Sequence, residues 1–217
     1  MEMVITAIEA QKGSRKQKIY INGEWRFSLY PGQTHQYELK EGMEISDLLI
    51  QRIGKETLLP QAKKRVLNLL TAKDRTRKEL LEKLAGDGYP DEICTEAVEY
   101  AKSYHYVDDL RFAITYLRSY EEEKSRLQLS MKLKEKGIPR EVAEEAFEAL
   151  REERVECMGE EFEEAETVAL RRQIAKKTKN AALSEKDAAK LTASLAAKGF
   201  SVSDIRSMLG ALSENKI

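Results

Sequence analysis

Few side chains in this sequence have the types and spacing of a catalytic or metal site. The two histidines, His35 and His105, lie far apart, and the sequence places no obvious partner beside either, whereas a metal ion or a general base needs partners within reach. Asp108 and Asp109 form a carboxylate pair that could hold a cation. Because they directly precede an amphipathic stretch, 111–120, we interpret them as helix-capping residues instead.

The two cysteines, Cys94 and Cys157, are far apart, and neither belongs to a CxxC or Cys/His cluster. Cys94 falls on the apolar side of an expected helix, where a thiol serves as a small hydrophobic group. The sequence contains no phosphate-binding loop and no GxGxxG, HExxH or GxSxG motif. We therefore expect no catalytic residue, no cofactor and no bound metal.

The location of the protein is also suggested by what the sequence lacks. Unpaired cysteines favour a reducing compartment. The sequence has no signal-peptide pattern and no apolar run near the roughly 18 residues that a membrane span needs. A cytoplasmic protein without membrane contact is the expectation.

The elements that position these side chains repeat along the chain. Each of three windows has two leucines four residues apart, then a glycine four residues later, then a bulky apolar residue. Leucines at this spacing share a helix face, and the glycine can end the helix in the left-handed conformation. Repetition at this period predicts stacked helical units with a long exposed surface. The windows are Leu80-Leu84-Gly88-Tyr89, Leu129-Leu133-Gly137-Ile138 and Leu191-Leu195-Gly199-Phe200.

Helix-start signals recur with the same period. Thr76-x-x-Glu79 and Ser125-x-x-Gln128 both fit the capping box. Pro90 and Pro139 stand two residues after the glycines, where proline fits the first turn of another helix. In the third copy the leucine helix can start from Ser184. We expect helices at 93–101, 142–150 and 205–212 after the glycines, and a longer helix over 160–175 that leads into the third copy.

The N-terminal region has the different pattern of a small β-sheet. Residues 3–10, 18–22 and 25–29 are rich in β-branched and aromatic residues, and Asn22-Gly23 is a strong hairpin signal. Pro31-Gly32 breaks this pattern, and 45–53 returns to helical spacing. The predicted organisation is an N-terminal β-rich extension with a linker helix over 1–58, followed by helical repeats at 59–107, 108–155 and 156–217.

Charge is segregated along the chain although the formal net charge is only -1. Residues 62–83 contain eight basic and three acidic residues, whereas 151–166 contain eight glutamates and two arginines. A basic run is often only a solvated helix face, but its recurrence in three stacked units favours a shared ridge. The candidate partner-binding residues are Arg75, Arg77, Lys78, Lys83, Arg111, Arg118, Arg126, Lys132, Lys134, Lys136, Arg171, Arg172, Lys176 and Lys177.

Three segments resemble a known family. The string from Tyr106 to Ala113 (YVDDLRFA) is similar to the G-Y-[IL]-[DN]-D-x-x-[FY]-A signature of bacterial RecX regulatory proteins. Residues 74–84 resemble the R-x-[RS]-[ST]-x-x-E-L-x-x-K-L segment of that family, and Lys136-Gly137-Ile138 matches its K-G-I. The resemblance spans roughly 62–150. This chain departs from the signature at His105, where glycine is usual, and at Leu110, where a polar residue is common.

The resemblance implies a fold and a partner. RecX proteins consist of three tandem three-helix repeats in an elongated, curved array, so this chain is expected to be mainly α, with helix-turn-helix-like repeats and a small antiparallel N-terminal sheet. They lie in the groove of the RecA filament on single-stranded DNA and inhibit filament growth, ATPase and strand exchange. A role in DNA repair, homologous recombination and the SOS response follows, with a monomer as the expected active form.

Two alternatives remain open at this stage. Short capped helices joined by a glycine turn also describe a sequence-tolerant helix-turn-helix DNA-binding regulator. The helices after the first two glycines carry more acid than base, which is unfavourable beside phosphates. The other alternative is a helical scaffold for a different protein partner.

Overall fold

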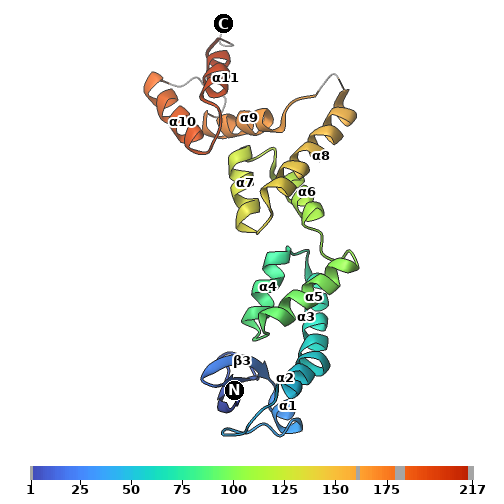
Figure 1. Ribbon diagram of the computed structural model, residues 1–217. Coiled ribbons are helices and arrows are strands. Elements are labelled where there is room, and N and C mark those ends of the chain that lie inside the picture. The colour runs from blue at the N-terminus through green and yellow to red at the C-terminus, as the bar shows by residue number, and fades with distance from the viewer. Residues whose placement is uncertain (1, 160–161, 179–183, 215–217) are drawn as a thin grey trace. The chain divides into compact units, whose positions relative to one another are not determined.

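The computed structural model describes residues 2–159, 162–178 and 184–214. Two compact units, Met1–Asp108 and Asp109–Ile217, make up the chain (Figure 1). The fold is mainly helical with one small antiparallel sheet, which confirms the fold class predicted from the sequence.

The sheet forms where the β-branched and aromatic runs predict it. Its strands pair antiparallel in the order β1-β2-β3. Asn22 and Gly23 form the β2–β3 turn with φ angles of +51° and +85°, the conformation that the favoured hairpin turn requires. The strands are β1 (Ile5–Ala10), β2 (Gln17–Ile21) and β3 (Glu24–Leu29).

A short helix follows the sheet at a place where the sequence predicts only a break. Pro31 takes one of the first positions of α1, where its missing N–H costs nothing. The Tyr30 N–H donates to Oε1 of Gln33 at 3.0 Å. The interpretation of Pro31-Gly32 as a simple interruption was therefore incomplete. The helices of the first unit are α1 (Pro31–Gln36), α2 (Asp47–Ile53), α3 (Leu59–Ala72), α4 (Arg77–Gly86) and α5 (Asp91–Ser103).

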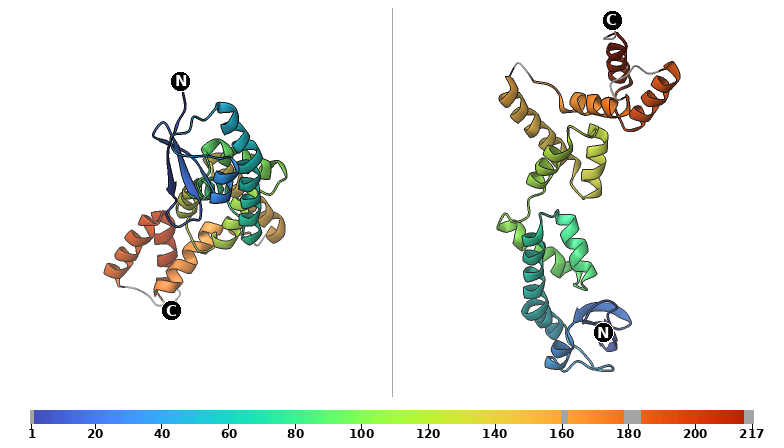
Figure 2. Two further views of the ribbon diagram at one scale, coloured as in Figure 1. Left: turned by 90° about the horizontal axis from the view of Figure 1, so that it is seen from below. Right: turned by 180° about the vertical axis from the view of Figure 1, so that it is seen from behind.

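The segment Gly54–Leu58 joins α2 to α3 as a single π-helical turn. Pro60 stands at the start of α3 and has no N–H to donate to the preceding turn. A wider turn just before it is a common way to accommodate such a loss within a continuous helical segment. Both views of Figure 2 show the sheet beside this segment, which runs from α2 into α3.

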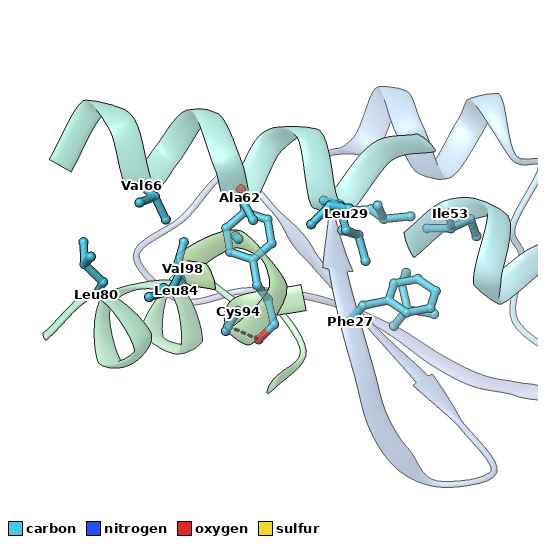
Figure 3. Packing of buried hydrophobic residues seen from close by; sticks show 14 of the residues in the cluster. Phe27, Leu29, Ile53, Ala62, Val66, Leu80, Leu84, Cys94 and Val98 are labelled. Carbon is cyan, nitrogen blue, oxygen red and sulfur yellow. Dashed lines mark hydrogen bonds between the residues drawn. The ribbon is translucent and has the colours of Figure 1, made fainter. Parts of the chain in front are cut away.

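The sheet and the first repeat share one apolar core. Figure 3 shows Phe27 and Leu29 of β3 in the same cluster as Ala62 of α3 and Leu84 of α4. All four side chains are buried. The N-terminal extension is consequently part of the folding unit of the first repeat.

The second unit contains two three-helix groups, and each has a core of its own. One apolar cluster lies among α6, α7 and α8, and a separate cluster lies among α9, α10 and α11. The helices are α6 (Asp109–Tyr120), α7 (Arg126–Glu135), α8 (Arg140–Met158), α9 (Ala165–Thr178), α10 (Glu185–Ala197) and α11 (Val202–Glu214).

The repeated leucine and glycine pattern has the predicted role in all three groups. The leucines at 80, 84, 129, 133, 191 and 195 are all buried. Gly88, Gly137 and Gly199 have φ angles of +84°, +81° and +97°, so each ends its helix in the left-handed region. The hydroxyls of Thr76 and Ser125 accept from the N–H three residues on, at 3.2 Å in both cases. The helix-turn-helix unit is confirmed.

Several helix boundaries differ from the prediction. Pro90 and Pro139 are the N-cap residues of α5 and α8 rather than first-turn residues. Helix α8 continues to Met158, well beyond the predicted end at 150, and therefore includes Cys157. Helix α9 begins at Ala165 instead of 160, and residues 160 and 161 lie outside the described part.

Candidate functional site

The candidate basic residues lie on or beside the helices of all three repeats, and many of them pair with glutamates. In the first repeat, Nε of Arg77 on α4 lies 3.1 Å from Oε1 of Glu99 on α5. Nζ of Lys78 lies 3.8 Å from Oε1 of Glu82 on the same helix. Arg75, just before α4, donates from Nε to the Leu69 carbonyl at 3.4 Å. The surface near α4 therefore alternates positive and negative charge.

The second repeat repeats this alternation. Arg118 on α6 pairs with Glu153 on α8 at 2.6 Å, and Arg126 on α7 pairs with Glu144 on α8. Lys132 donates to Glu135 at 2.6 Å, and this hydrogen bond raises the pKa of Lys132 above its usual value. The remaining candidates in this repeat, Arg111, Lys134 and Lys136, lie on α6 and α7 or at the C-cap of α7.

In the third repeat all the candidates lie on α9. Arg171 pairs with Glu163, with its Nη1 atom at 2.9 Å from Oε2. Arg172 reaches Glu122 of the second repeat at 2.5 Å. Lys176 and Lys177 are exposed in the last turn of α9, where positive charge stabilises the helix dipole.

Arg172 is part of a polar junction between the second and third repeats. On α8, the side chain of Arg154 is mostly buried. Its Nε atom lies 3.6 Å from Oε1 of Glu121, and its Nη2 atom pairs with Glu122. Glu121 is only 14% exposed on its side chain, and its burial raises its pKa despite the attraction of Arg154. Buried ion pairs of this kind are sensitive to the loss of one partner, because the other charge is left unpaired.

The same junction contains backbone contacts. Ser125, the N-cap of α7, donates its hydroxyl to the Lys198 carbonyl. A Cβ on Gly199 would lie 2.5 Å from Cβ of Leu127, so the glycine turn of the third repeat packs directly against the first turn of α7. Nε2 of Gln173 donates to the Glu123 carbonyl at 2.8 Å.

A cavity of about 290 Å³ opens at this junction. Phe147 and Phe162 line it, with the guanidinium groups of Arg126 and Arg151 at 4.3 and 5.5 Å from the centres of these rings. Glu164, Glu166 and Asp204 contribute acid to the same wall, so the two signs of charge are mixed. Such a lining does not select an anion or a cation, and the groups that a catalytic site would need do not converge here.

Sequence reasoning missed the role of Lys16. Its side chain is buried, and Nζ donates to the Asp87 carbonyl at the end of α4 at 2.9 Å and lies 3.8 Å from the Tyr89 ring centre. Burial lowers the pKa of Lys16 below its usual value. Asp87 also pairs with Arg65 at 2.7 Å. Lys16 thus attaches the sheet to the end of α4, and its flanking residues give no sequence signal for this.

The residues with potential chemistry lie apart. His35 and His105 are exposed, and His105 has φ +58° at the position where the family signature has glycine. Cys94 is buried as predicted, with its thiol donating to the Tyr89 carbonyl at 3.4 Å, and burial raises the pKa of Cys94 to about 11. Among the described residues, no group of three His, Cys, Asp or Glu side chains could hold a metal ion. None of the helices in that part of the chain is both long and apolar enough to span a membrane.

Comparison with known proteins identifies the repeats. Residues 62–100 match the family model described as RecX, first three-helix domain, and residues 108–146 match the second three-helix domain. The crystal structure of a regulatory protein RecX aligns with a TM-score of 0.61 at 22% identity, over 96% of this chain and 99% of that one. The crystal structure of RecX from Lactobacillus salivarius aligns with a TM-score of 0.54 at 23% identity, over 72% of this chain and 97% of that one. These two show the shared fold.

Curated relatives extend the match to nearly the whole chain. Regulatory protein RecX of Clostridium acetobutylicum is 30% identical over 96% of this chain and 95% of its own length. Regulatory protein RecX of Caldanaerobacter subterraneus is 29% identical over 95% of this chain and 98% of its own length. With two matched three-helix domains and full-length relatives, the chain belongs to the RecX family of regulatory proteins.

Proposed function

We propose that this protein binds the RecA filament on single-stranded DNA and inhibits filament growth, ATPase and strand exchange. Membership of the RecX family carries this proposal, and the relatives align over almost their full length. The family resemblance implies RecA as the partner. The protein would act as a monomer in the bacterial cytoplasm, where the filament forms, and would regulate without catalysing a reaction.

The repeat architecture supports binding through many weak contacts. Each helix-turn-helix group presents basic residues on its surface, and most of these already have glutamate partners about half exposed to solvent. A partner must displace these glutamates, so each contact contributes little on its own. Once one group is bound, the next binds at high effective concentration. Weak basic surfaces on several helix-turn-helix groups are then enough for binding. The affinity for the filament should fall as the salt concentration rises.

The helix-turn-helix DNA-binding alternative is less well supported by the surface charge. On α5, which follows the first glycine turn, the side chains of Asp91, Glu92, Glu96 and Glu99 are exposed. On α8, Glu141, Glu145 and Glu148 are exposed in the same way. A helix inserted in the major groove lies between phosphates, which repel such a surface.

The function is tested by the ATPase activity of RecA on single-stranded DNA. Purified protein is added from far below stoichiometry up to one copy per RecA. We expect the ATPase rate to fall at substoichiometric amounts, because one copy contacts more than one protomer. An unchanged rate at every ratio would contradict the proposal.

The role of the basic residues is tested by charge reversal near α4. The variant Arg75→Glu, Arg77→Glu, Lys78→Glu should weaken filament binding about tenfold or more, because favourable contacts become repulsive. A matched control reverses Lys12, Lys40 and Lys55, three exposed residues with the same total charge change. Equal inhibition by both variants, with thermal melting like that of the wild type, would exclude this part of the surface.

A further inference from the structure

Helix α7 of the second repeat exposes an apolar pair on the side opposite its core. Leu127 and Met131 are four residues apart, so they share a helix face. They are 52% and 57% exposed, whereas Leu129 and Leu133 of the same helix are buried in the core of the repeat. A helix that is apolar on both sides is typical of one that is covered on both sides. The core of the repeat covers only one side of α7.

The other two repeats have different residues at the positions of this pair. Counted from the buried leucines, the first repeat has a lysine and a glutamate there, which lie 3.8 Å apart as an ion pair, and the third repeat has two exposed alanines. Helices α4 and α7 have the same length, and each begins at a hydroxyl N-cap. The helix-turn-helix unit therefore forms without an apolar pair on this face. The corresponding residues are Lys78 and Glu82 on α4, and Ala189 and Ala193 on α10.

Packing between the second and third repeats accounts for only part of this surface. A Cβ on Gly199 would lie 2.5 Å from Cβ of Leu127, so Leu127 covers the glycine turn of the third repeat with one side of its side chain. The residue is nevertheless half exposed, and Met131, one turn further along α7, is more exposed still. The rest of the apolar surface is available to another molecule.

The charges around the pair on α7 are mainly positive. Arg126, Lys132 and Lys134 are exposed on this helix, and Glu135 is its single carboxylate. Such a surface complements one that is apolar at its centre and acidic at its edge. Nucleic acid does not have this chemistry, because leucine and methionine offer neither a flat ring for a base nor a donor for a phosphate. The surface therefore fits a protein.

We propose that Leu127 and Met131 are the apolar anchor with which this protein binds RecA, on a RecA surface that is apolar at its centre and acidic at its edge. The inference rests on the proposed function and deepens it. Salt weakens the basic contacts of the three repeats, whereas the screening of charges does not weaken the burial of two apolar side chains. Methionine is enriched at protein interfaces, and its flexible side chain adapts to an irregular surface.

The test transfers the ion pair of α4 to α7. The variant Leu127→Lys, Met131→Glu has the residues of Lys78 and Glu82 at the corresponding positions, and its net charge is unchanged. Fluorescence anisotropy of the labelled full-length protein measures its binding to RecA filaments assembled beforehand on single-stranded DNA. We expect binding to be about tenfold weaker or more. The factor should be the same at low and high salt, because the variant loses apolar surface and no net charge.

Ala189→Lys, Ala193→Glu is the matched control, because it introduces the same two side chains at the corresponding positions of α10. It should bind filaments as the wild type does. Met131→Gln is a second variant that leaves the contact between Leu127 and the Gly199 turn intact. It should bind about fivefold more weakly. Hydrogen exchange in α9–α11 checks that the third repeat keeps its structure in each variant.

Normal filament binding by the double variant on α7, or equal weakening by the control on α10, would overturn the inference. A double variant that loses the same factor of affinity for single-stranded DNA without RecA would overturn it and assign the face to DNA. Wild-type protein that sediments as a dimer, with a monomeric double variant, would assign the pair to a second copy and also overturn it. Wild-type protein that does not bind filaments would refute the proposed function as well, whereas normal binding by both wild type and double variant would refute this inference alone.

Discussion

The junction between the sheet and the first repeat differs from the junction between the second and third repeats. At the first, strand residues and helix residues lie in one buried apolar cluster, and one buried lysine, Lys16, caps the end of α4. At the second, two apolar clusters remain separate. The contacts across it are largely polar and include Arg172 with Glu122, Gln173 with the Glu123 carbonyl and Ser125 with the Lys198 carbonyl.

The difference shows that two junctions in one repeat protein can couple the folding of their two sides to different degrees. Apolar burial is not weakened by the screening of charges in salt, and it couples the folding of both sides. Ion pairs weaken as salt rises and depend on the protonation of their members. We expect the sheet to unfold together with α3, α4 and α5, and the third repeat to separate from the second under milder conditions. A protein that fits itself to a filament can use such a polar junction to adjust.

The largest effect is expected from truncating the shared core. Leu29 of β3 is fully buried, so Leu29→Ala should cost about 2–5 kcal/mol of unfolding free energy. Hydrogen exchange should become faster in α4 and α5 as well as in the sheet. Leu48→Ala, at a residue 79% exposed, is the control and should change little. Faster exchange confined to the strands would show that the sheet is a separate unit.

Adding a methyl group to the glycine turns compares the two junctions directly. In Gly199→Ala the new Cβ would lie 2.5 Å from Leu127, and in Gly88→Ala it would lie 2.6 Å from the Ser28 hydroxyl. Each should cost about 1–3 kcal/mol through overpacking and left-handed strain. The Gly199 variant should lose exchange protection only in α9–α11, whereas the Gly88 variant should lose it throughout the first unit.

Gly13→Ala is the control for strain alone, because Gly13 has φ +75° with no atom within 4 Å of the added carbon. A Gly13 variant as unstable as the other two would show that packing at the turns contributes nothing. Loss of protection throughout the second unit in the Gly199 variant would contradict the separate cores.

Removing Arg154 should weaken the second repeat on the side where it meets the third, because Arg154 pairs with two glutamates of its own repeat and donates to the Glu163 carbonyl. Arg154→Ala leaves Glu121 and Glu122 without this partner, and we expect a loss of about 1–2 kcal/mol, because the site is only partly closed to water. Melting curves at low and high salt check this, and the difference from wild type should shrink as salt rises. A difference that is independent of salt would mean that Arg154 acts through packing.

The smallest effect concerns the protonation of Glu121. Burial raises its pKa in the folded protein above the usual 4.5, so ionisation opposes folding. The protonated carboxyl of Glu121 contributes favourably to the free energy of folding. This contribution is complete below pH 4.5 and is lost as the pH rises through the folded-state pKa. Glu121→Gln should therefore be more stable than wild type at pH 7, by less than about 1 kcal/mol, and the gain should vanish near pH 4. Chemical denaturation at both pH values measures this, and a variant less stable than wild type at pH 7 would contradict it.

The repeated helical unit could be predicted from the sequence because its signals are local. The leucines, the capping residues at Thr76 and Ser125, and the glycine turns each depend on neighbours within a few residues. The hairpin at Asn22-Gly23 is equally local. These signals fixed the element types well, but they placed the ends of α8 and α9 poorly, because glutamate-rich sequence continues from one helix to the next.

The junctions could not be predicted because their partners are distant in sequence. In the sequence nothing distinguishes Lys16 from an ordinary surface lysine, but the fold brings it to Asp87, 71 residues away. Ser125 and Lys198 are 73 residues apart, and neither residue type indicates the contact. The basic candidates were found from charge alone, but their glutamate partners on neighbouring helices became visible only in three dimensions.

The central claim is that this protein limits the growth of RecA filaments, and filament growth itself tests it most directly. Fluorescent RecA is assembled on single-stranded DNA under a microscope while the purified protein is added at substoichiometric amounts. We predict that extension slows or stops and that raising salt relieves this inhibition. Extension at the normal rate, with folded protein present at one copy per RecA, would contradict the account.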